Sequence, residues 1–321
     1  MENKLCGKII QGVGGLYSVR ILNTDSPLFG KYEDCRARGS FRHNNLSPLP
    51  GDNVILLPAT EPARDLKDKN EGKEQFVIDE ILPRKNSLIR PPLANLDYIF
   101  VTMSAASPIP VLSTVDKMTA IAEFNGIEPV IVITKAELDR AYAKELEEIY
   151  KKCGFTVFTL SAALGEGIEP MEQYIAQRLP TKTAAFAGAS GIGKSTLLNR
   201  LFPNLSLSTS EISRKIQRGR HTTRKVELFP LSDAADCGYI ADTPGFSMLD
   251  FERFDFFEKD NLFGAMRELR PLEGMCRYTK CSHTKEEGCA VVEAVSSGDI
   301  PASRHQSYCE LYDILKKKKK W

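Results

Sequence analysis

Short runs of alternating apolar and polar positions fill residues 1–60 of the chain. This alternation has the period of half-buried β-strands, and it predicts strands at residues 7–10, 16–22, 34–38 and 52–57. Glycine and proline at 12–15 and 49–52 mark turns between them. Several short strands in so small a segment predict a compact β-barrel.

Cationic and aromatic residues gather near the third strand, namely Arg36, Arg38, Phe41, Arg42 and His43. Oligonucleotide-binding (OB) barrels, the common barrels of this size, stack bases on aromatic rings beside a basic groove. The cluster therefore favours an OB-fold that binds RNA. On spacing alone, a β-module without an RNA role is an equally good interpretation.

The pattern changes after a polar stretch at 61–75, which predicts a linker. Apolar runs typical of buried strands, at 96–104, 129–135 and 156–160, then alternate with two helical segments. The first helix is expected to open with a capping box at Ser113–Asp116, and the second to run from Asp139 to Cys153. Such alternation predicts an α/β domain with a parallel sheet covered on both faces. From about residue 252 the pattern becomes helical.

A full Walker A motif, Gly-Ala-Ser-Gly-Ile-Gly-Lys-Ser, occupies residues 188–195 between a predicted strand and a predicted helix. Its glycines let backbone N–H groups turn toward phosphates, and the helix N-terminus attracts negative charge. Lys194 would reach the β and γ phosphates, and the Ser195 hydroxyl would bind Mg²⁺. The nucleotide-binding residues predicted here are Gly188, Ala189, Ser190, Gly191, Ile192, Gly193, Lys194, Ser195 and Thr196.

Two further segments complete a phosphate site. Asp242-Thr-Pro-Gly245 follows an apolar strand, which is the Walker B position; Asp242 would hold Mg²⁺, and the Gly245 N–H would contact the γ-phosphate. Residues 219–224, Gly-Arg-His-Thr-Thr-Arg, fit a switch loop whose threonine completes the metal shell. Thr222 and Thr223 compete for that role.

Guanine recognition requires a base-reading motif, and the matching residues lie upstream of the P-loop. Thr134-Lys135-Ala-Glu137 ends one buried strand, and Ser161-Ala162 ends the next. The motifs therefore follow a circularly permuted order, which a sheet tolerates when its termini can meet. Alternatively, residues 136–138 begin a helix and Lys135 alone packs over the base.

Catalysis needs a group that orients the attacking water. Ras-like enzymes use a Gln just after the Asp-x-x-Gly motif, but this chain has Phe246, which can neither donate nor accept a hydrogen bond. His221, within the switch segment, is the best replacement. A loop histidine without a catalytic role is the alternative.

Four metal-binding side chains lie within fourteen residues: Cys276, Cys281, His283 and Cys289. Three thiolates and one imidazole suit a closed, tetrahedral Zn²⁺ site with a structural role. A redox-active cysteine pair is disfavoured, because Cys-x4-Cys is not the usual Cys-x-x-Cys spacing.

Composition sets the context. The 321 residues are 26% charged with a formal net charge of +1, so contact with nucleic acid must come from local patches. One such patch is Lys316–Lys320; a run of this kind is usually a solvated helix end, but beside a zinc module RNA phosphates are a reasonable partner. No apolar run suits a membrane span or a signal peptide, and the eight cysteines fit reduced thiols or metal ligands. We therefore expect a cytoplasmic protein.

On these motifs the chain resembles the bacterial circularly permuted GTPases that depend on the small ribosomal subunit. The resemblance rests on Arg90–Asp97, Thr134-Lys135, Gly188–Ser195, Gly219–Thr223, Asp242–Gly245 and the cysteine cluster. It implies a multidomain protein: an OB-fold barrel at 1–65, a permuted α/β P-loop GTPase domain at 76–250 and a mainly helical zinc-binding domain at 251–321. It also places the family's catalytic histidine at His221.

The resemblance further implies a GTP hydrolase that acts as a switch in late maturation of the 30S subunit. Its partners would be GTP or GDP, the subunit and 16S rRNA, with one Zn²⁺ and with Mg²⁺ accompanying GTP, and we expect a monomer without membrane contact. One departure is Glu137, where the family usually has Asp, which puts guanine selectivity in question. A non-hydrolysing guanine-nucleotide sensor and a zinc-containing RNA adaptor are the alternatives.

Overall fold

The computed structural model describes residues 4–39, 41, 46–59, 76–203, 226–242, 251, 254 and 256–318. The chain forms two compact units. The first contains residues 1–96, 178–185 and 220–244, and the second contains 97–177, 186–219 and 245–321. None of the described helices has the length and apolar character needed to cross a bilayer.

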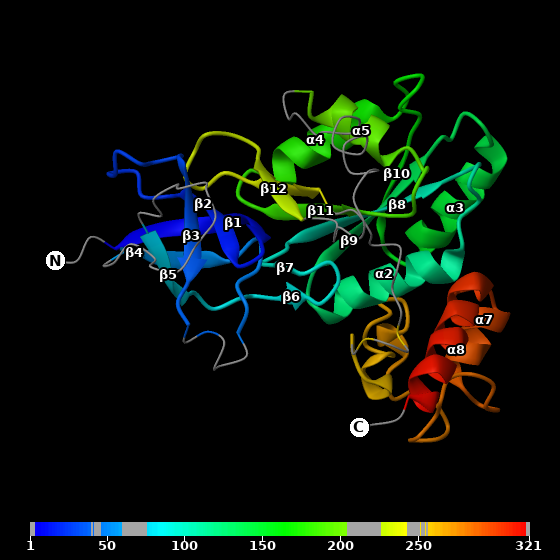
Figure 1. Cartoon of the computed structure of the whole chain (residues 1–321). Coiled ribbons are helices and arrows are strands. Elements are labelled where there is room, and N and C mark those ends of the chain that lie inside the picture. The colour runs from blue at the N-terminus through cyan, green and yellow to red at the C-terminus, as the bar shows by residue number, and fades with distance from the viewer. Residues whose placement is uncertain are drawn as a thin grey trace, which may run out of the picture. The chain divides into compact units, whose positions relative to one another are not determined.

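A five-stranded barrel lies at the start of the first unit (Figure 1). Its strands are β1 (Leu5–Val13), β2 (Leu16–Ile21), β3 (Tyr32–Ala37), β4 (Asn53–Pro58) and β5 (Phe76–Ile81). β1 pairs with β2 and β4, and β5 pairs with β3 and β4. Alternate side chains fill the core, including Ile9, Val19, Val54 and Ile78. The four predicted strands are confirmed.

Two features of the barrel differ from the sequence interpretation. β5 lies within the range predicted for the GTPase domain, although it closes the barrel; the domain boundaries themselves stay predictions. Phe41, expected to stack on a base, packs against the barrel core instead, and Arg38 pairs with Asp79. Arg42 and His43 lie outside the described residues.

Three more strands belong to the first unit: β11 (Thr183–Ala187), β12 (Glu227–Pro230) and β13 (Tyr239–Asp242). β13 runs parallel to β11, as predicted, with Ala185 opposite Ala241. β12 is antiparallel to β13 because a short turn joins the two strands, and it also pairs with β1. The last two residues of β11 belong to the second unit.

The family motif at 90–97 has a structural role in the first unit. It contains β7 (Leu93–Ala94), which pairs with β6 (Ser87–Leu88). The Asn95 side chain donates to the Gly51 carbonyl at 3.0 Å and accepts from the Lys85 N–H at 2.9 Å. A Cβ on Gly51 would lie 2.1 Å from the Ala94 carbonyl oxygen, so only glycine allows this approach.

The second unit contains a parallel sheet in which β9 (Glu128–Thr134) lies between β8 (Tyr98–Ser104) and β10 (Thr156–Thr159). Its helices are α2 (Leu112–Phe124), α3 (Arg140–Lys152), α4 (Ile168–Arg178) and α5 (Lys194–Leu201). The helix predicted at Asp139–Cys153 is confirmed as α3, and Asp139 caps it by accepting from the Tyr142 N–H at 2.9 Å.

The predicted capping box of α2 is wrong. The helix begins at Leu112 after Val111, which makes no side-chain cap, so Ser113 lies inside the first turn. Asp116 is buried and hydrogen-bonds to Tyr150 and Arg304. Its carboxylate therefore serves tertiary packing and leaves the helix end uncapped.

The C-terminal part of the second unit is helical, as predicted. It contains the 3₁₀ turns η1 (Lys259–Asn261) and η2 (Arg270–Leu272), followed by α7 (Ala290–Ser296) and α8 (Ala302–Lys317). Figure 1 shows α8, in red, close to α2.

Candidate nucleotide and metal sites

The Walker A loop adopts a conformation that only glycine permits at its start. Gly188 has φ +149°, and a Cβ there would lie 2.4 Å from both the Thr102 carbonyl oxygen and Ile192 Cδ1. Gly193, at φ +90°, precedes α5, which Lys194 and Ser195 begin. Ala189, Ser190 and Gly191 are exposed, as are Ser195 and Thr196. An exposed loop leading into a helix N-terminus suits a phosphate group.

The predicted base-reading residues lie against the P-loop, although 56 residues separate Lys135 from Gly191. Lys135 Nζ donates to the Gly191 carbonyl at 2.8 Å and to the Ser107 carbonyl at 2.5 Å. The buried Thr134 hydroxyl hydrogen-bonds to the Ile192 carbonyl and lies 3.0 Å from the Met103 carbonyl. These two upstream residues therefore contact the P-loop, and their role in base reading stays a prediction.

The next two residues along the chain, Ala136 and Glu137, belong to the loop that is predicted to read the base. Glu137 Oε2 is buried, and within the described part of the chain it has no hydrogen-bond partner. A buried carboxylate oxygen without a donor costs free energy unless a ligand supplies one. The Ala136 N–H donates to the Leu160 carbonyl at 3.2 Å, which holds this loop beside the one that contains Ser161 and Ala162.

The remaining phosphate-site residues are described only in part. Asp242 is the last residue of β13, and its backbone lies opposite Glu227 of β12. His221, Thr222, Thr223 and Gly245 lie outside the described residues. Their predicted roles, together with that of the Asp242 side chain, stay predictions.

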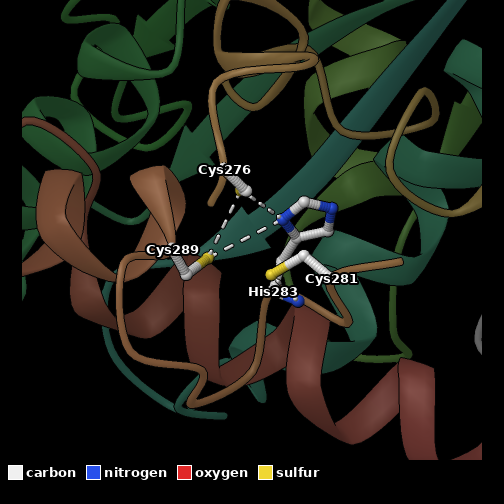
Figure 2. A group of neighbouring side chains, drawn as sticks. All are labelled: Cys276, Cys281, His283 and Cys289. Atoms are coloured by element: carbon white, nitrogen blue, oxygen red, sulfur yellow. Dashed lines mark hydrogen bonds between the residues drawn. The ribbon is translucent and has the colours of Figure 1, made fainter. Parts of the chain in front are cut away.

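The four predicted metal ligands converge, as Figure 2 shows. Their ligand atoms all lie within 4.8 Å of one another. Cys276 Sγ is 3.3 Å from His283 Nδ1 and 3.8 Å from Cys289 Sγ, and Cys289 Sγ is 3.7 Å from His283 Nδ1. Ligands at ~2.1–2.3 Å from a tetrahedral Zn²⁺ would be separated by about 3.5–3.8 Å. The spacing therefore suits a metal ion of this kind.

Hydrogen bonds within the surrounding loop help to fix the positions of these four residues. Glu286 accepts hydrogen bonds from the N–H groups of Ser282, Thr284 and Lys285. Although partial burial raises its pKa, these bonds and the Ser282 hydroxyl lower the pKa of Glu286 to about 2. Burial raises the pKa of the Cys281 thiol to about 12. Without a cation the Cys281 thiol would keep its proton, and a divalent cation would favour its thiolate.

Together, the fold and the site define a P-loop GTPase whose base-reading loops precede its Walker A motif, that is, a circularly permuted GTPase. The RsgA N-terminal domain model matches residues 6–61, and the RsgA GTPase model matches residues 81–252. The chain therefore belongs to the RsgA GTPase family.

Relatives and solved structures agree with this assignment. A protein of Caldanaerobacter subterraneus named "Small ribosomal subunit biogenesis GTPase RsgA" is 39% identical, over 99% of this chain and 98% of its own. A protein of Bacillus pumilus with the same name is 37% identical over 98% of both chains. YjeQ from Thermotoga maritima is 30% identical with a TM-score of 0.75, over 98% of this chain and 100% of its own. YloQ, titled a circularly permuted GTPase, is 32% identical with a TM-score of 0.71, over 99% of this chain and 97% of its own.

No sequence motif predicts the backbone contacts that hold the loop containing Thr134 and Lys135. Ser107, whose carbonyl holds Lys135, lies between β8 and α2 and belongs to none of the motifs. The Thr134 hydroxyl bonds to the P-loop backbone, a contact that no motif predicts, and its role in nucleotide binding stays a prediction. Every residue has a backbone carbonyl, so the identity of Ser107 or Ile192 could not predict that its carbonyl accepts these hydrogen bonds.

Proposed function

We propose that this chain hydrolyses GTP and acts as a nucleotide-dependent switch in late maturation of the 30S ribosomal subunit. The observation that carries the proposal is the contact between the predicted base-reading loop and the P-loop in the second unit. Thr134 and Lys135 hold the P-loop backbone, and the nearby Glu137 carboxylate has an oxygen in need of donors. The guanine N1–H and exocyclic amine would supply those donors, whereas adenine has no N1–H. The relatives' names connect this family with biogenesis of the small subunit.

In this proposal each part of the site has a separate task. Lys194 and the P-loop N–H groups bind the β and γ phosphates, while Ser195, Asp242 and one of Thr222 and Thr223 would hold Mg²⁺. When bound, Mg²⁺ neutralises charge that develops on the phosphates. His221 orients the attacking water, because Phe246 follows the Asp-x-x-Gly motif in place of a glutamine.

The cysteine cluster has a different role. Three cysteines and one histidine would occupy all four positions of a tetrahedral Zn²⁺ and leave none for a substrate, so we assign the metal to folding. The lysine-rich end of α8, the helix that follows this cluster, is a candidate contact for 16S rRNA phosphates. We further propose that the protein is a monomer and works in the cytoplasm, where the subunit matures.

The direct test is multiple-turnover hydrolysis of GTP and ATP, each with and without purified 30S subunits. We expect hydrolysis of GTP that the subunit stimulates, with little turnover of ATP. Tight GTP binding without turnover under any condition would favour the non-hydrolysing sensor. Binding of 30S subunits with no measurable nucleotide affinity would favour the zinc-containing RNA adaptor.

A further inference from the structure

The barrel pairs directly with the strands that border the predicted switches. In the first unit Gln11 of β1 lies opposite Glu227 of β12, and Glu227 lies opposite Asp242 of β13. Along the same edge, β1 pairs with β4 at Leu5–Lys8 and with β12 at Gln11. Between these two pairings, at Ile9–Gln11, the register of β1 against β2 shifts. The backbone of Asp242 is thus one strand away from the barrel wall.

Arg20 of the barrel hydrogen-bonds to the turn end of the β12–β13 hairpin. Arg20 comes from β2 of the barrel, and its side chain is 1% exposed. Its Nη1 donates to Cys237 Sγ at 2.9 Å, to the Tyr239 hydroxyl at 3.0 Å and to the Ala234 carbonyl at 3.4 Å. Its Nη2 donates to the Ser232 carbonyl at 3.3 Å. These acceptors all belong to the β12–β13 turn or to the first residue of β13.

The buried Arg20 guanidinium finds its hydrogen-bond acceptors in this hairpin. No ion pair joins Arg20 to a carboxylate within the residues that the structure describes. The buried Tyr239 ring lies near two barrel cations, with its centroid 5.9 Å from the Arg20 guanidinium and 5.3 Å from Lys8 Nζ. A buried guanidinium without these acceptors would carry a large desolvation cost. Moving the hairpin away from the barrel would therefore be unfavourable.

We infer that Arg20 is a positioning residue for the metal-binding end of β13. Tyr239 and Asp242 are the first and last residues of one four-residue strand. Both ends of that strand are therefore held on the barrel. Arg20 hydrogen-bonds to Tyr239 at one end, and at the other end Asp242 pairs through Glu227 with Gln11 of β1. This inference rests on the proposed function, which assigns Asp242 to Mg²⁺. It makes the barrel a part of the phosphate-sensing machinery.

The test measures metal-dependent binding and needs no turnover. We would titrate Mg²⁺ against binding of a fluorescent, non-hydrolysable GTP analogue by the full-length protein and by Arg20→Met. Substituting a residue that orients a metal ligand commonly costs about 10–100-fold in metal affinity. We expect Arg20→Met to raise the Mg²⁺ concentration for half-maximal binding about tenfold. GDP affinity without Mg²⁺ should stay within about twofold, since P-loop contacts dominate it.

Arg84→Met is the matched control. Arg84 belongs to the same unit, and its guanidinium donates to Asp52 and to the Ser47 carbonyl, away from the hairpin. Its loss should lower the melting temperature without changing the Mg²⁺ requirement. Tyr239→Phe, which keeps the ring and loses the acceptor, gives a second readout if Arg20→Met reduces the folded fraction. Arg20→Lys should partly restore the wild-type value.

The outcomes separate this inference from the proposed function. If Arg20→Met and Tyr239→Phe lose thermal stability but keep the wild-type Mg²⁺ requirement, Arg20 is only structural and the inference is wrong. If the wild-type protein binds the analogue no better with Mg²⁺ than without it, the assignment of Asp242 to Mg²⁺ is wrong, and so is the inference. A raised Mg²⁺ requirement in the two hairpin variants alone supports the inference.

Discussion

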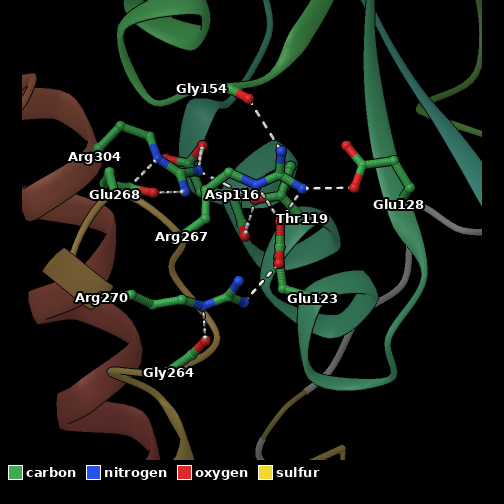
Figure 3. A network of polar contacts seen from close by, with 10 residues as sticks. All are labelled: Asp116, Thr119, Glu123, Glu128, Gly154, Gly264, Arg267, Glu268, Arg270 and Arg304. Atoms are coloured by element: carbon green, nitrogen blue, oxygen red, sulfur yellow. Dashed lines mark hydrogen bonds and ion pairs between the residues drawn. The ribbon is translucent and has the colours of Figure 1, made fainter.

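Arg304 of α8 and Asp116 of α2 form a buried ion pair, 188 residues apart in sequence, with Arg304 Nη1 2.5 Å from Asp116 Oδ1 (Figure 3). Their side chains are 1% and 2% exposed. The same guanidinium donates to Glu268 at 2.7 Å, and the Tyr150 hydroxyl of α3 donates to Asp116 at 2.9 Å. One arginine therefore joins the C-terminal helix to two helices of the nucleotide-binding core.

Removing this arginine should destabilise the second unit strongly. Arg304→Met leaves Asp116 and Glu268 buried without their cation, and breaking a buried pair in this way costs about 3–5 kcal/mol. Urea unfolding monitored by circular dichroism would measure the loss. Arg140→Met is the control, because Arg140 and its partner Glu166 are 67% and 47% exposed, and such pairs contribute about 1 kcal/mol or less. Equal losses in the two variants would contradict a special role for the buried pair.

Glu137 should determine the choice of base. In Glu137→Ala we expect GDP affinity to fall about 10–100-fold, the range for losing a hydrogen bond to a charged group, while ADP affinity stays unchanged. Glu137→Asp keeps the carboxylate that the family usually has and should keep the preference for guanine. Titration calorimetry with both nucleotides measures these effects. An equal change for GDP and ADP in Glu137→Ala would place the carboxylate away from the base.

Gly188 should tolerate no side chain. Its φ and the 2.4 Å approach to the Thr102 carbonyl oxygen mean that Gly188→Ala must displace the P-loop backbone, and nucleotide affinity should fall by more than about tenfold. Gly126→Ala is the control: it has φ +66° with open space around the position, so it meets only the left-handed backbone cost of about 1–2 kcal/mol. Wild-type GDP affinity in Gly188→Ala would contradict the P-loop assignment.

The cysteine cluster should hold one Zn²⁺ per chain. Elemental analysis of protein purified without chelator would count the metal, and Cys281→Ser should lose it. Because metal binding contributes to folding in small metal-bound domains, chelation should expose the amides around α7 to hydrogen exchange before those of β8 and β9. Cys309→Ser, outside the cluster, should keep the ion. Protein without zinc, with unchanged exchange after chelation, would contradict the assignment.

The sequence predicted the parts of this molecule that depend on local patterns. The Walker A glycines, the strand alternation and the cysteine spacing each follow from backbone or ligand geometry, so residue identity reveals them. Asp116 shows the limit: its position suggested a helix cap, but a partner 188 residues away determines its contacts. The basic residues around Phe41 likewise predict a ring that stacks on bases, because no local signal shows that Phe41 packs on the barrel core.

If this protein is a guanine-nucleotide switch that acts on the small subunit, its affinity for 30S subunits must depend on the bound nucleotide. The measurement compares a non-hydrolysable GTP analogue with GDP at fixed salt, because phosphate contacts weaken as salt rises. We expect tighter 30S binding in the GTP-like state and, by linkage, an equal increase in the affinity for the analogue on the subunit. Equal 30S affinities in the two states would contradict it and leave an RNA-binding protein that holds GTP without responding to it.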